Sequence, residues 1–86
     1  MYKKINSIVS LTAYPNPSNG VFTIAIPSDQ KEVFIHVFNT FGQLVLSNTY
    51  ELLNGSIQLD LSSEPNGFYM AKIQLDAPLD VRLLKK

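Results

Sequence analysis

The side chains that could carry out chemistry are few and widely separated in this sequence. The single histidine, His36, lies within an apolar segment, and no serine or carboxylate accompanies it in a recognisable catalytic order. The chain also lacks the second histidine or the cysteines that a zinc site would need. We therefore interpret His36 as a residue on the face of a β-strand, and we expect the chain not to be an enzyme.

Acidic side chains offer the next candidate site, because carboxylate oxygens bind hard cations. Asp76 and Asp80 could approach each other across a turn, but their spacing matches no EF-hand loop. Aspartates in turns usually hydrogen-bond to the local backbone. The glycines are isolated instead of clustered before a helix, so no phosphate-binding loop is indicated. We expect no metal and no cofactor.

Aromatic side chains leave one alternative open, a carbohydrate- or protein-binding module of a secreted surface enzyme. Flat rings stack on the apolar faces of sugars, and the candidate rings are Tyr14, Tyr50, Phe68 and Tyr69. Tyr69 belongs to an alternating apolar segment, which predicts that it lies in the core. Tyr50 is then the ring available to a sugar.

The bulk composition limits the classes of function. The length of 86 residues allows one domain, and 45% apolar with 16% charged residues is typical of a chain that buries a core. Seven basic and seven acidic side chains cancel, so the positive field of a nucleic-acid-binding protein is missing. We expect no nucleic-acid partner, no signal peptide at residues 1–11 and no membrane-spanning helix.

Turn-forming residues divide the chain into segments of strand length. They lie at 15–20, Gly42, 54–55 and 64–67, and three of the four glycines follow Asn. Asn-Gly predicts a tight reversal, because both central residues of a type I′ turn have positive φ. The segments between them alternate apolar and polar residues, as half-buried strands do. The predicted strands cover residues 8–14, 21–26, 32–39, 43–51, 56–61, 67–75 and 79–84.

Seven short strands with frequent turn signals predict an all-β fold, an antiparallel β-sandwich with immunoglobulin-like architecture. An open barrel is the alternative. Segment 32–39 is apolar on both faces, so we place it centrally, with its valines and isoleucine inward and Phe34 and Phe38 on the outer face. Aromatic residues on an outer face usually pack against neighbouring side chains. The other interpretation is a surface for a partner.

Three blocks of sequence, at residues 11–20, 35–45 and 57–73, resemble in their order a known family, the type A C-terminal sorting domains of type IX secretion substrates in Bacteroidetes-type bacteria. The most specific block contains a Tyr-Pro-Asn-Pro motif followed by a turn. A fourth block, 81–86, is similar to the basic and apolar terminal strand of the family, with Arg82 where lysine is usual. The residues in the first three blocks that carry the resemblance are Tyr14, Pro15, Asn16, Pro17, Asn19, Gly20, Gly42, Pro65, Gly67 and Tyr69.

The resemblance implies a secretion signal. Residues 11–86 would form a sorting domain that follows a passenger protein, is presented in the periplasm and is recognised by the translocon, shuttle and sortase proteins of the outer membrane. The sortase usually removes such a domain, and the passenger is released or attached to the cell surface. Residues 1–10 would then be a linker remnant that contains the cleavage point.

We expect the terminal strand to be the part that the translocon recognises. Its exposed edge could add to a partner sheet through backbone hydrogen bonds, while its basic ends set the orientation. The same edge could exchange between two copies and give a homodimer. The predicted recognition residues are Arg82, Leu83, Leu84, Lys85 and Lys86.

The motif prolines and glycines have a folding role in this interpretation. Pro15 and Pro17 lack backbone N–H groups and fix φ, so they end the first strand and stiffen the loop that follows it. Gly42 and Gly67 are turn positions.

Overall fold

A computed structural model describes residues 11–75 and 78–86 of the chain. Within these ranges there are seven strands and no helix, and the bounds of the second to the seventh strand agree with the predicted ones to within one residue. The prediction that residues 1–10 are a linker remnant concerns residues outside the described ranges. The strands are β1 (Thr12–Tyr14), β2 (Val21–Ala25), β3 (Glu32–Asn39), β4 (Leu44–Glu51), β5 (Ser56–Asp60), β6 (Gly67–Gln74) and β7 (Leu79–Lys85).

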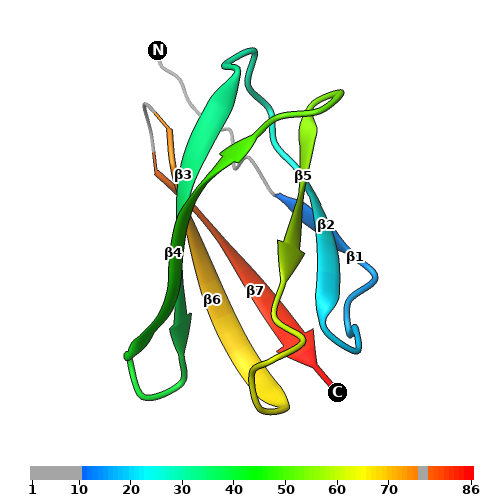
Figure 1. Ribbon diagram of the computed structural model, residues 1–86, viewed down its shortest axis with the longest axis vertical. Helices are drawn as coiled ribbons and strands as arrows, with labels where there is room; N and C mark the ends of the chain where they lie inside the picture. The colour runs from blue at the N-terminus through cyan, green and yellow to red at the C-terminus, as the bar shows by residue number, and fades with distance from the viewer. Residues whose placement is uncertain (1–10, 76–77) are drawn as a thin grey trace, which may run out of the picture.

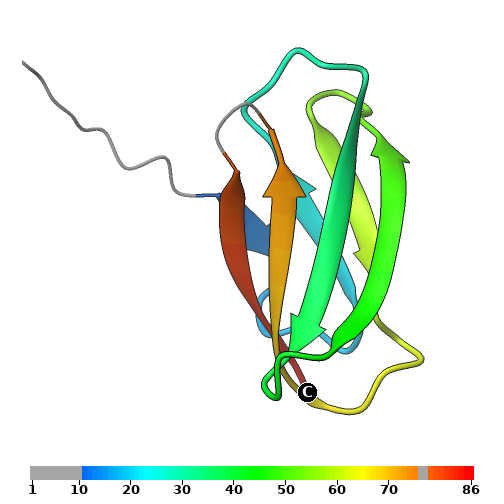
Figure 2. The same ribbon diagram turned by 90° about the vertical axis from the view of Figure 1, so that its left-hand side faces the viewer.

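The strands form two antiparallel sheets that face each other (Figure 1). One sheet has the order β1-β2-β5, and the other has the order β4-β3-β6-β7, which Figure 2 shows face on. The predicted sandwich is confirmed, in place of the open barrel. In constant-type immunoglobulin domains the fourth strand joins the sheet of the first, second and fifth strands. Here the turn at Gly42 keeps β4 beside β3 instead.

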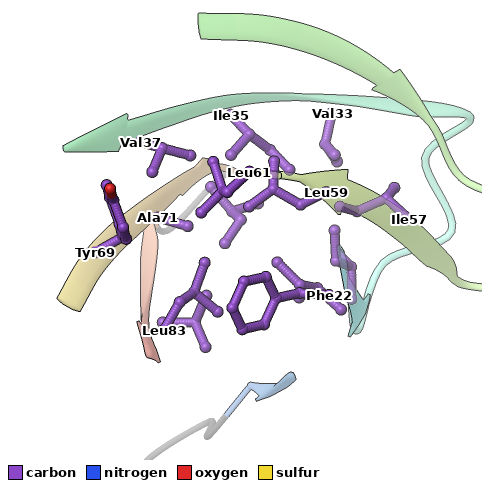
Figure 3. Close-up of a cluster of buried hydrophobic side chains, with 14 residues drawn as sticks. Phe22, Val33, Ile35, Val37, Ile57, Leu59, Leu61, Tyr69, Ala71 and Leu83 are labelled. Atoms are coloured by element: carbon purple, nitrogen blue, oxygen red, sulfur yellow. The ribbon is translucent and has the colours of Figure 1, made fainter. Parts of the chain in front are cut away.

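Strict alternation of residues gives each strand one buried face. Along β2, Phe22 and Ile24 are fully buried while Val21 and Ala25 are exposed, because successive side chains point to opposite sides of a strand. Figure 3 shows the inward side chains, Phe22 among them, packed between the sheets. The buried apolar cluster consists of Phe22, Ile24, Ile26, Val33, Ile35, Val37, Ile57, Leu59, Leu61, Tyr69, Ala71, Ile73, Val81 and Leu83.

The central position predicted for segment 32–39 is confirmed, since β3 pairs with both β4 and β6. Its valines and isoleucine are buried, and Phe34 lies on the outer face. The Phe34 ring meets the His36 ring edge-on, with 4.6 Å between the ring centroids. His36 Nδ1 also lies 3.1 Å from Ser47 Oγ on β4. His36 is therefore a strand-face residue, held by its neighbours on the sheet.

The three Asn-Gly pairs do not behave alike. Asn54 and Gly55 have φ angles of 55° and 77°, as a type I′ turn requires, and this reversal leads from β4 to β5 in the opposite sheet. Asn19 and Asn66 have no positive φ, so the type I′ turn expected for their pairs is wrong, although the chain reverses at both places. The chain there follows longer loops, at 15–20 and 61–66, whose course is set by packing against other segments.

Candidate recognition surface

The sequence motifs gather at one end of the sandwich, the lower end in Figure 1, which we call the motif end. It is made of the loops at residues 15–20, 40–43 and 61–66 together with the C-terminal residues 84–86. Antiparallel pairing brings them together, because β1, β3, β5 and β7 all end there while β2, β4 and β6 begin there. Motifs far apart in the chain therefore share one surface.

Asn16 joins the first motif to the terminal strand. Its side-chain Nδ2 donates a hydrogen bond to the carbonyl oxygen of Arg82 at 3.0 Å, and its Oδ1 accepts one from the backbone N–H of Leu84 at 2.9 Å. One amide group thus pairs with a donor and an acceptor on the outer edge of β7, much as a neighbouring strand would. The loop holds β7 along this edge.

Ser18 continues this contact toward the C-terminus. Its backbone N–H donates to the Leu84 carbonyl at 3.0 Å, and its carbonyl accepts from the N–H of Lys86 at 2.9 Å. Ser18 is itself buried, and its Oγ accepts a hydrogen bond from the N–H of Gly20. Three backbone groups of β7 and the N–H of Lys86 after it are therefore already paired, which leaves the last part of this edge little capacity to add to a partner sheet.

The two prolines flank this contact. β1 ends at Tyr14, directly before Pro15, as the sequence predicts. The Tyr14–Pro15 and Asn16–Pro17 peptide bonds are both cis. Between them, Asn16 has its side chain on the edge of β7.

The side chains of the terminal strand alternate between core and surface. Leu83 is fully buried, and Lys85 is 8% exposed because its Nζ donates to the carbonyl oxygens of Ser62 and Glu64. Of the five residues predicted to be recognised, Leu83 and Lys85 therefore support the fold from within. Recognition by this strand stays a prediction, and the surface that it offers consists of Arg82, Leu84 and Lys86.

The outer face of the four-stranded sheet is hollowed at the motif end. Phe68, which is 52% exposed, lies opposite Leu84, and Met70 lies opposite Arg82. Two adjacent grooves, of about 380 Å³ and about 260 Å³, meet here and share Phe68 and Arg82. The first is lined by Asn39, Thr40, Phe68, Tyr69, Met70 and Arg82. The second is lined by Asn16, Pro17, Phe68, Arg82, Leu83 and Leu84.

A comparison with protein-family models decides the identity of the chain. Residues 12–82 match the family described as the secretion system C-terminal sorting domain. The chain belongs to this family. The resemblance in the sequence motifs is thereby confirmed, and the sorting domain is a C-terminal signal for type IX secretion, which implies a preceding passenger and export to the cell surface or beyond. No curated protein matches the chain.

Tyr69 anchors the loop 61–66 of the sorting domain. The ring is buried, as predicted, and its hydroxyl donates to the carbonyl oxygen of Pro65 at 2.5 Å. This is the geometry of a tyrosine corner, in which a tyrosine near the start of a strand bonds to the backbone just upstream. Burial raises the pKa of the Tyr69 phenol, and the nearby charge of Glu64 raises it further. The phenol therefore stays protonated and remains a donor.

Asp60 organises the start of the same loop. Its Oδ1 accepts hydrogen bonds from the backbone N–H of Ser62 at 2.9 Å and from the Ser62 hydroxyl. These bonds favour the charged carboxylate and lower the pKa of Asp60, with a smaller contribution from the positive charge of Lys85. Asp60 thus has a structural role in holding the turn.

Tyr50, the ring expected to bind a sugar in the carbohydrate-binding alternative, is not freely exposed. Tyr50 was predicted to be available to a sugar, but it is half-buried and packs against the core cluster. The reason is its register: Tyr50 lies opposite Val33, and directly opposed residues of an antiparallel pair point to the same face. Tyr14 and Phe68 are the more exposed rings, at 50% and 52%.

The part of the chain that the structure describes holds no group of three or more side chains able to bind a metal ion together. Asp76, one of the two aspartates considered for a cation, lies outside the described residues. No helix within 11–75 and 78–86 has the length and apolar character to cross a membrane.

Several residues of the motif end were not found by sequence reasoning. The burial of Lys85 is indicated by the sequence, because Lys85 continues the alternation of inward residues at Val81 and Leu83. Phe68 was considered only as a ring for sugars. Nothing in the local pattern indicates the buried position of Ser18, which depends on the terminal strand lying beside it.

We expect Asn16→Ala to lower the free energy of unfolding by about 1–2 kcal/mol, because Arg82 and Leu84 each lose a hydrogen-bond partner. The uncovered edge of β7 should also promote association between copies. Urea denaturation measures the first effect, and sedimentation at several concentrations measures the second. Asn19→Ala is the control, since Asn19 is exposed in the same loop. Equal stability and equal sedimentation of the two variants would contradict the proposed role of Asn16.

Proposed function

We propose that this sorting domain is read as a folded address that directs its passenger through the type IX translocon of the outer membrane and that it catalyses nothing. The translocon and its shuttle proteins recognise it after it reaches the periplasm, and a sortase then removes it. The observation that carries the proposal is the convergence of the motifs of the family on the motif end, where Asn16 joins them to β7.

Recognition as a folded domain follows from how the motif residues are used. The polar groups of Asn16, Tyr69 and Lys85 form hydrogen bonds within the domain. Such residues act on a partner indirectly, by fixing the shape of the surface around them. An extended chain would present none of this shape, because each contact joins residues from separate segments.

The paired edge of β7 favours a surface of side chains over strand addition as the means of recognition. Strand addition would require the loop 15–20 to leave β7, which breaks the hydrogen bonds made by Asn16 and Ser18. Exposed side chains at the same place can be contacted without any such cost. Arg82, Leu84 and Lys86 are the side chains of β7 and the residue after it that meet this condition.

Removal by a sortase is compatible with this architecture. The first strand begins at Thr12, so cleavage within residues 1–10 would cut the chain ahead of β1. The sandwich would then keep all of its strands after cleavage. We therefore propose that the domain remains folded when the passenger leaves it.

The experiment is an export assay in a host with a type IX system. A reporter with a signal peptide is fused ahead of residues 1–86, and the reporter in the medium and on the cell surface is compared with the same fusion lacking residues 11–86. We expect export only with the domain. Equal export of the two fusions would refute the proposal. Deleting Leu83 to Lys86 is a less specific test, because it also removes a core residue and the Lys85 contacts.

A further inference from the structure

The two grooves at the motif end form one continuous surface of defined chemistry. Phe68 and Arg82 belong to both grooves, and Met70 and Leu84 border them from the same two strands. Apolar and neutral polar side chains thus surround a single cation. Exposed apolar patches with polar rims mark sites of protein interaction more often than ordinary surface.

The cation at the centre has no carboxylate partner within the described residues. An ion pair on the same face joins Lys72 Nζ to Asp80 Oδ2 at 3.7 Å. These two residues form the next cross-strand pair on this face after Met70 and Arg82. Asp80 is therefore engaged by Lys72, and no acidic residue lines either groove. A guanidinium group in this position is suited to a carboxylate, which it can bind through two parallel hydrogen bonds.

The backbone beneath these side chains is held from two sides. The carbonyl oxygen of Arg82 accepts from Asn16, while Phe68 precedes Tyr69, whose ring is fixed in the core by its bond to Pro65. The strand positions from which the Phe68 and Arg82 side chains extend are therefore set before a partner arrives. A preorganised surface loses less conformational entropy on binding than a mobile one does.

We propose that these grooves are a docking surface for a polypeptide segment of the export machinery that carries a large apolar side chain close to an aspartate or glutamate. The apolar side chain packs against Phe68 and Met70, and the carboxylate pairs with Arg82. This inference rests on the proposed function and names the chemistry of the partner at that site.

A polypeptide fits this surface better than a lipid headgroup layer or a nucleic acid does. Both of those polyanions are bound by clusters of lysine and arginine. Here a single arginine lies among apolar and neutral polar residues, and the whole chain has a formal net charge of zero. One carboxylate next to one apolar side chain matches this arrangement.

The first test is the export assay with two variants in the surface and two controls outside it. Arg82→Glu and Phe68→Ala should each lower export at least about tenfold, as central arginine and aromatic contacts do in interfaces. Lys31→Glu and Phe34→Ala are the controls, since both residues are exposed and neither lines a groove. Each should export within about twofold of the parent, because single surface substitutions away from an interface have small effects. The thermal midpoint of each purified domain shows that the variants are folded.

The outcomes separate this inference from the proposed function. If Arg82→Glu and Phe68→Ala export like the parent while deletion of residues 11–86 abolishes export, the docking surface is refuted and the sorting function holds. If all four variants lose export equally, the grooves have no special role and the inference fails. If deletion of residues 11–86 has no effect on export, the sorting function is refuted, and the docking surface that rests on it is refuted with it.

The second test addresses the partner. A photoreactive benzoylphenylalanine replaces Phe68 in exporting cells, and the cross-linked peptide is sequenced. We expect a segment with an aspartate or glutamate beside the attachment point, and changing that acid to lysine should restore export of the Arg82→Glu variant at least about tenfold. A cross-linked segment without an acidic residue, or no restoration by the reversed charge, would overturn the inference.

Discussion

Leu83→Ala is expected to lower the free energy of unfolding by about 3–5 kcal/mol, as the truncation of a fully buried leucine does. Leu83 is fully buried between the sheets, where Figure 3 shows it among the core residues near Phe22. Its truncation removes apolar contacts and leaves a cavity that the neighbouring strands can fill only in part. Urea denaturation of the purified domain at 25 °C measures the loss.

Leu84→Ala is the matched control, because it makes the same chemical change one residue further on. Leu84 is half-buried on the outer face, so its truncation leaves no closed cavity and should cost about 1 kcal/mol or less. If the two variants unfolded at the same urea concentration, the inward direction assigned to Leu83 would be wrong. Leu84 lines the second groove, so its variant reports on recognition with the fold intact.

The difference between these neighbours changes how deletions at the C-terminus are interpreted. Loss of residues 83–86 removes a core side chain, and it also removes the lysine that bonds to the loop 61–66. At about 0.05–0.15 kcal/mol per residue, a folded domain of this size has a free energy of unfolding of roughly 4–13 kcal/mol. Failed export after such a deletion can therefore result from unfolding as well as from lost contacts with the translocon. Arg82→Glu changes an exposed side chain, so its effect on export measures the contribution of the surface.

The strands and the core were predictable because they depend on local alternation. In β2 and β7 the period-two pattern alone separates buried Phe22 and Leu83 from their exposed neighbours. The same pattern contains Lys85 and indicates an inward position, although lysines are seldom buried and the sequence was interpreted only as placing Lys85 at a recognition surface. Its burial is allowed by the carbonyl oxygens of the loop 61–66, which only the folded chain brings to it.

The state of the terminal edge was not predictable in this way. Asn16 bonds to residues 66 and 68 positions away, and no pattern within a segment encodes such a contact. The sequence alone therefore predicts an open edge at β7. Tyr50 was misplaced for a related reason, since its face is set by pairing with β3, which contains an irregularity between Val37 and Phe38. Contacts between segments, and not within them, are what build the motif end.

Gly20→Ala should show how closely the two loops of the motif end are packed. A Cβ atom at Gly20 would lie 2.8 Å from Ser62 Cα and 2.9 Å from Ser62 Cβ, and the φ angle of 150° is one that side chains rarely adopt. Because backbone must move to relieve the overlap, we expect a loss of about 2–4 kcal/mol in the free energy of unfolding. The thermal midpoint should fall by more than about 10 °C.

Gly67→Ala provides the control, because Gly67 has the same φ, 150°, but has nothing within 4 Å of the added atom. It should cost only about 1–2 kcal/mol, which is the conformational penalty alone. The excess loss in Gly20→Ala then measures the contact between the loops 15–20 and 61–66, which is also made by the hydrogen bond from Leu61 to Gly20. If both variants melted alike, these loops would not form one packed unit, and the shape that holds Asn16 against β7 would lack its support.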